Sequence, residues 1–88
     1  MTGSIKDQIR KFLLEDPFYL ENLPRDFSDE ESLLDSGALD SIGIFNLVVF
    51  LESNFNIHIQ IGELSEIHFA SLSRIEKFVE AKILAQDV

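Results

Sequence analysis

The sequence predicts an all-α fold, a small four-helix bundle with a long loop between the first two helices and a short third helix. Apolar residues recur at helical spacing in three stretches, within 4–15, 41–54 and 72–84. Only residues 55–61 alternate as a strand would, and one strand alone has nothing to pair with. The 88 residues are 45% hydrophobic, enough for one modest core, so we expect a single domain over 1–88.

The first helix is predicted over 4–15. Ser4 and Asp7 have the spacing of a helix cap, with Asp in place of the usual Glu. The helix should end near residue 16, because Pro17 disfavours helical geometry in the residue before it. The apolar residues on its inner face are Ile5, Ile9, Phe12 and Leu13.

Residues 17–40 form an unusually long connection, punctuated by Pro17, Pro24 and Gly37. Loops longer than about 15 residues are uncommon in compact domains and often functional. We expect apolar side chains to hold this one on the core, namely Phe18, Tyr19, Leu20, Leu23 and Phe27.

The second helix, over 41–54, is apolar on more than one face. Steps of 100° per residue gather an inner stripe for the core, made of Ile44, Leu47, Val48, Leu51 and Phe55. Ile42 and the exposed series Gly43, Asn46, Val49 and Ser53 fall on the other side, with Phe45 and Phe50 at the boundary. Eight of the ten residues from 42 to 51 are apolar, so we expect apolar surface to remain uncovered beside Ser41.

The rest of the chain returns to the core. We interpret 55–61 as an extended connector that buries alternate isoleucines, Ile57, Ile59 and Ile61. A short third helix is predicted over 63–68. Ser71 should cap the last helix, over 72–84. The inner residues of that helix are Leu72, Ile75, Val79 and Ile83.

Composition excludes several classes of function. Sixteen acidic against seven basic residues give a net charge of -9, so nucleic acid is not an expected partner. There is no cysteine, hence no thiolate site, and two histidines are too few for structural zinc. The acidic run 26–35 has Glu31 where a calcium loop needs glycine, so no metal is expected. No apolar run of about 18 residues and no signal peptide are present, which favours a cytoplasmic protein without a transmembrane segment.

Asp40-Ser41 stands where a glycine-containing turn gives way to the second helix. Backbone N–H groups point outward at such a helix start and the helix dipole is positive there, so the position favours phosphate. This suits a serine that carries a phosphate-containing group. Simple helix capping by Asp40 and Ser41 is the alternative. A second Asp-Ser pair ends at Ser36, but no apolar helical run begins there, so the context selects Ser41.

Several segments together resemble the acyl and peptidyl carrier proteins, and the resemblance covers nearly the whole chain. The Leu34–Leu39 segment resembles the approach to that family's modified serine. The run ending in Asp40-Ser41-Ile42 also resembles aminoacyl and D-alanyl carriers. Similarity continues through Leu51-Glu52, Phe55-Asn56-Ile57 and the segment Phe69–Ile75.

The resemblance implies covalent carriage without catalysis. Ser41, flanked by the motif residue Asp40, would receive 4′-phosphopantetheine from coenzyme A through a phosphopantetheinyl transferase. A ligase or adenylation enzyme would load an acyl or aminoacyl group as a thioester, and acyl-processing enzymes would receive it. No nucleophile–base pair is visible, so we do not expect an enzyme. The expectation is a freestanding, monomeric acyl carrier of a specialised biosynthetic pathway.

One departure concerns partners. Fatty-acid carriers typically present several acids on the second helix, whereas here Glu52 is the main one. We therefore expect partner binding through Ile42, Phe45 and Val49, with Asn46 beside them. Two alternatives stay open: an aminoacyl, peptidyl or D-alanyl carrier loaded by an adenylation enzyme, and a helical interaction domain with no covalent group.

Overall fold

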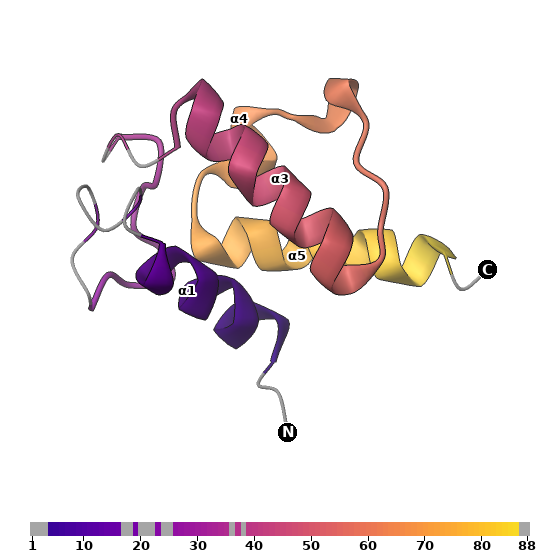
Figure 1. Ribbon diagram of the computed structural model, residues 1–88, viewed down its shortest axis with the longest axis horizontal. Coiled ribbons are helices and arrows are strands. Elements are labelled where there is room, and N and C mark those ends of the chain that lie inside the picture. The colour runs from indigo at the N-terminus through magenta and orange to yellow at the C-terminus, as the bar shows by residue number, and fades with distance from the viewer. Residues whose placement is uncertain are drawn as a thin grey trace.

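A computed structural model describes residues 4–16, 19, 23, 26–35, 37 and 39–86. These residues form four α-helices, one 3-10 turn and no β-strand, which confirms the predicted all-α class (Figure 1). The elements are α1 (Ile5–Glu15), α3 (Ser41–Phe55), the 3-10 helix η1 (Ile61–Glu63), α4 (Glu66–Phe69) and α5 (Leu72–Gln86).

Helix α5 is the element that the other helices share, because α1, α3 and α4 all pack against it. In Figure 1, α3 crosses obliquely in front of α5 and α1 lies to one side. The predicted inner stripe of α3 is confirmed in Leu47, Val48 and Leu51, which are buried, while Ile44 and Phe55 are partly buried against the core. The fully buried residues of the other long helices are Ile9, Leu13, Leu72, Ile75 and Val79.

The ends of α1 follow the sequence closely. The Ser4 hydroxyl accepts a hydrogen bond from the Asp7 N–H at 3.2 Å, as the cap spacing predicts. At the other end the Asp16 N–H donates to the Phe12 carbonyl, and Asp16 itself is extended. Pro17 is the physical reason for that extended residue.

Apolar side chains hold the long connection on the core. Tyr19, Leu23 and Phe27 are buried, as predicted. Phe18 and Leu20 lie outside the described residues. Further along, the Leu33 N–H donates to the Ala70 carbonyl at 2.9 Å, next to the start of α5.

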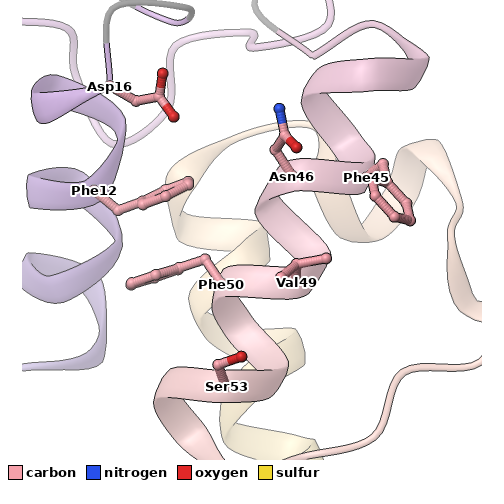
Figure 2. A pocket seen from close by; sticks show the side chains of 7 residues that line it. All are labelled: Phe12, Asp16, Phe45, Asn46, Val49, Phe50 and Ser53. Atoms are coloured by element: carbon pink, nitrogen blue, oxygen red, sulfur yellow. The ribbon is translucent and has the colours of Figure 1, made fainter.

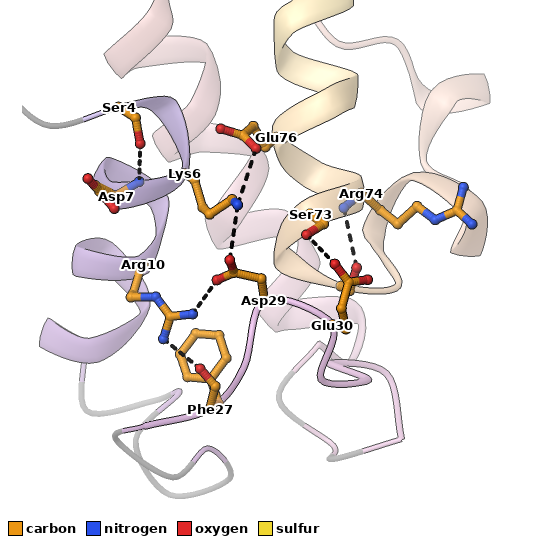
Figure 3. A network of polar contacts seen from close by, with 11 residues as sticks. Ser4, Lys6, Asp7, Arg10, Phe27, Asp29, Glu30, Ser73, Arg74 and Glu76 are labelled. Carbon is orange, nitrogen blue, oxygen red and sulfur yellow. Dashed lines mark hydrogen bonds and ion pairs between the residues drawn. The ribbon is translucent and has the colours of Figure 1, made fainter.

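Polar contacts, absent from the sequence predictions, attach the same connection to α1 and α5 (Figure 3). Asp29 accepts from Lys6 Nζ at 3.0 Å and from the Arg10 guanidinium at 2.6 Å. Arg10 also donates to the Phe27 carbonyl and lies over the Phe27 ring, 4.3 Å from its centre. Lys6 reaches Glu76 of α5 at 3.7 Å. We call these five residues, Lys6, Arg10, Phe27, Asp29 and Glu76, the Asp29 network.

The connector after α3 departs from the predicted alternation at its end. Asn56 adopts the left-handed conformation (φ 54°, ψ 49°) and closes α3, after which Ile57 and Ile59 are buried. The prediction for Ile61 is wrong, because its side chain is 88% exposed. Ile61 begins η1, so the extended backbone that would have turned it inward stops at Gln60.

The predicted helix over 63–68 is also wrong in its bounds. In its place are η1, an irregular pair of residues, and the single turn α4. The Glu63 carboxylate accepts from the Gln60 N–H at 2.9 Å and from Lys82 Nζ at 2.8 Å. These two contacts close a tight local turn and tie it to α5, so the chain re-enters helical geometry only at Glu66.

Candidate functional site

Ser41 is the first residue of α3 and is exposed. The preceding residue, Asp40, caps the helix: its Oδ1 accepts from the Gly43 N–H at 2.8 Å. Its main-chain carbonyl accepts from the Ile44 N–H, also at 2.8 Å. Asp40 therefore fixes the start of the helix, and the residue next to it presents its hydroxyl at the positive end of the helix dipole.

A hydroxyl in this position is suited to hold a phosphodiester, because a helix start offers outward N–H groups to an anion. Neither histidine is hydrogen-bonded to this hydroxyl within the part of the chain that the structure describes. His58 lies beyond the far end of α3, roughly 20 Å along the helix axis from Ser41. The His68 ring stacks on the Phe78 ring, with 4.5 Å between the ring centres.

The segment just before Ser41 packs against the core through Leu39. Gly37 has φ 84°, a conformation that favours glycine and explains the turn at this point. Leu39 is buried, and its N–H donates to the Leu33 carbonyl at 3.3 Å. Ser36, the competing serine, lies outside the described residues.

One contact at the site was missed by sequence reasoning. The Tyr19 hydroxyl, buried in the long connection, donates to the Gly43 carbonyl at 2.6 Å. Burial raises the pKa of Tyr19 above its usual range, which keeps the phenol a neutral donor. The prediction that Gly43 lies on the exposed face is wrong, because Gly43 is buried. No local pattern pairs residue 19 with residue 43, although a tyrosine in a long loop is a signal that its hydroxyl needs a partner.

Three of the predicted partner residues form one exposed apolar strip, which we call the outer face of α3. Ile42, Phe45 and Val49 are 60%, 66% and 47% exposed. Asn46 is half-buried beside them. Glu52, by contrast, makes contacts within the fold. Its carboxylate accepts a hydrogen bond from the Ile59 N–H at 2.9 Å and lies 3.6 Å from the His58 ring nitrogen.

The outer face continues into an open groove between α1 and α3, which Figure 2 shows. Phe12 of α1 and Phe50 of α3 stack at 4.2 Å and are nearly parallel. The residues lining the groove are Phe12, Asp16, Phe45, Asn46, Val49, Phe50 and Ser53. The strip beside Ser41 thus extends toward α1 as well as along α3.

Two negative findings apply to the described residues. They bring no group of three or more His, Asp or Glu side chains together in a way that could hold a metal ion. None of the helices they form is both long and apolar enough to cross a membrane.

Comparison with known proteins gives a consistent result. The chain is 41% identical over 51 residues to the D-alanyl carrier proteins of Streptococcus pyogenes serotype M5 (strain Manfredo), serotype M49 (strain NZ131) and serotype M1. The match covers 58% of this chain and 65% of each relative, just under two thirds of the relatives' length. No family model matches. These relatives confirm the predicted resemblance to the carrier proteins and place it near the D-alanyl branch.

Proposed function

We propose, from the premise of this similarity to carrier proteins, that the protein carries an aminoacyl group on a 4′-phosphopantetheine arm attached to Ser41. The observation that supports the attachment is the exposed serine directly after the capping Asp40. The relatives are named for carrying D-alanyl, so D-alanine is the first cargo to test.

In the attachment step, Ser41 Oγ attacks the phosphorus of coenzyme A that bears the pantetheine group. The bond between the two phosphates breaks, and adenosine 3′,5′-bisphosphate leaves. A base of the transferase takes the hydroxyl proton, since neither histidine of this chain is hydrogen-bonded to Ser41 among the described residues. This chain contributes the exposed nucleophilic oxygen and the helix start that favours the new phosphodiester.

Partner enzymes would bind the outer face of α3. Exposed apolar side chains commonly supply the energetic anchors of interfaces, and Phe45 and Val49 lie on the same helix as Ser41. Asn46 would contribute a polar contact at the edge of this strip. Glu52 would act indirectly, since it holds the connector through the Ile59 N–H. The scarcity of acids on this face favours a dedicated partner that binds through apolar contacts over a partner that binds through a basic surface patch.

The first test is the attachment itself. Incubation with a phosphopantetheinyl transferase and coenzyme A should add one phosphopantetheine mass to the intact protein. Ser36→Ala is the matched control and should keep that gain, whereas Ser41→Ala should abolish it. Loss of the gain in Ser36→Ala alone would mean that the other serine is the site. No gain in the unchanged protein would favour the interaction-domain alternative.

The second test concerns the cargo. The phosphopantetheinylated protein is offered D-alanine, other amino acids and fatty acids with enzymes that activate each as the adenylate. We expect a thioester with D-alanine or another amino acid, read as a mass gain that hydroxylamine removes. Loading by fatty acids alone would point instead to the acyl-carrier alternative.

A further inference from the structure

We propose that Tyr19 is a positioning residue for the modification of Ser41, acting through a hydrogen bond that holds the first turn of α3. This inference rests on the proposed function of Ser41. Tyr19 lies in the long connection, 24 residues before the glycine whose carbonyl it binds. Its hydroxyl binds the backbone carbonyl of Gly43, two residues after Ser41, so its effect on Ser41 would pass through the helix backbone.

The peptide groups of Gly43 are held on both sides. Its N–H donates to Asp40 Oδ1 at 2.8 Å, and its carbonyl accepts from the Tyr19 hydroxyl at 2.6 Å. Along the chain, Ser41 lies between Asp40 and Gly43. The turn that carries the serine is therefore fixed by its own cap at one end and by the long connection at the other.

Tyr19 is itself held firmly. Its N–H donates to the Asp16 carbonyl and its carbonyl accepts from the Leu23 N–H, both at 3.1 Å. Its ring lies 5.6 Å from that of Phe12, which stacks on Phe50 of α3. The side-chain and backbone contacts of Tyr19 together hold its hydroxyl against Gly43. The aromatic contacts through Phe12 also link Tyr19 to both α1 and α3.

The bond has no easy substitute. Tyr19 is fully buried and Gly43 is buried, so water does not readily replace a missing hydroxyl there. Because burial also raises the pKa of the phenol, the donor persists throughout the physiological pH range.

Helix ends open more readily than helix interiors. An enzyme that recognises Ser41 on an intact helix start binds only the molecules in which that turn is formed. The apparent affinity of the enzyme for the carrier is therefore reduced in proportion to the fraction of molecules with the turn formed. Loss of the Tyr19 hydroxyl should therefore weaken binding of the carrier to the transferase and leave the chemical step nearly unchanged.

The test compares Tyr19→Phe with Ile75→Val, a mild substitution at a buried position of α5 that serves as the stability control. In Tyr19→Phe, amide hydrogen exchange should accelerate at Gly43 and Ile44 more than at Leu51 in the middle of α3. With a phosphopantetheinyl transferase, KM for the carrier should rise roughly three- to ten-fold while kcat stays within about two-fold. Ile75→Val should show neither the local exchange pattern nor the rise in KM.

Equal behaviour of the two variants in exchange and in KM would overturn the proposal. If the unchanged protein is not modified at all, the proposed function fails, whereas normal modification with no effect of Tyr19→Phe refutes the positioning role alone.

A third protein tests the hydroxyl directly. Tyr19 is the only tyrosine in the chain, so biosynthetic incorporation of 3-fluorotyrosine alters this residue only. 3-Fluorotyrosine retains the hydroxyl, so amide protection at Gly43 and KM should match those of the unchanged protein. Values like those of Tyr19→Phe would count against the proposal.

Discussion

Helices α1 and α3 bury apolar stripes in the same core, yet their outward faces differ in kind. Two of the three cations of α1 are used within the fold, since Lys6 and Arg10 both bind Asp29 of the long connection. The outward side chains of α3 include Phe45, which is 66% exposed and is left uncovered by the described residues. The polar face of α1 serves the molecule's own stability, and the outer face of α3 remains available to something outside it.

The largest expected effect separates the two sides of α3. Leu51→Ala should lower the free energy of unfolding by about 3 kcal/mol, because it opens a cavity at a fully buried position. Phe45→Ala removes a larger side chain but should change that free energy by no more than about 0.5 kcal/mol. Urea denaturation measures both. A comparable loss in Phe45→Ala would show that the outer face belongs to the folded core.

The next effect concerns partners. Val49→Asp places a charge on the outer face and should reduce kcat/KM for loading by an adenylation enzyme, the proposed partner, about ten-fold, with helicity and Tm nearly unchanged. Ser53→Asp is the matched control, adding the same charge one turn further along the exposed side. Equal losses in both would mean that charge, rather than apolar contact, decides. A large fall in Tm for Val49→Asp would instead place Val49 in the core.

The smallest effect tests α1 through pH. Hydrogen bonds from Lys6 and then Arg10 lower the pKa of Asp29. A carboxyl whose folded pKa is depressed stabilises the fold above its unfolded pKa, about 4, and loses that contribution as pH falls through the folded value. Asp29→Asn should thus lower Tm by a few degrees at pH 7, with the difference shrinking below about pH 4.

Asp26→Asn, at an exposed acid of the same connection, is the control for that pH series and should leave Tm nearly unchanged. If the Tm difference between the unchanged protein and Asp29→Asn stays constant down to pH 2, the negative charge of Asp29 is not the source of the stability that the substitution removes.

Hydrophobic periodicity correctly predicted which side chains of α3 point toward the core and which point outward. The 100° steps that placed Leu47 and Leu51 inward and Ile42 and Val49 outward agree with the structure, because a single regular helix fixes those directions. The helix start at Ser41 could also be predicted, since a capping Asp and the following apolar run are local signals.

Contacts between distant segments could not be predicted in this way. Asp29 lies 23 residues from Lys6, and the acidic run around it gives no sign of which cation it will meet. Gly43 is buried and its carbonyl binds the Tyr19 hydroxyl from 24 residues away, whereas a helical projection treats such a glycine as a small exposed residue. The turn at Glu63 depends on Lys82 as well as Gln60, so local spacing alone predicted one helix where two short elements form.

The uncovered strip on α3 has a consequence for the protein in concentrated solution. Two copies could meet through Phe45 and its neighbours, but each carries a net charge of -9, and like charges repel at low ionic strength. Salt shortens the range of that repulsion to a few ångströms near 1 M, while apolar attraction persists. The surplus of acids thus opposes self-association through this apolar surface and leaves it free for the proposed partner.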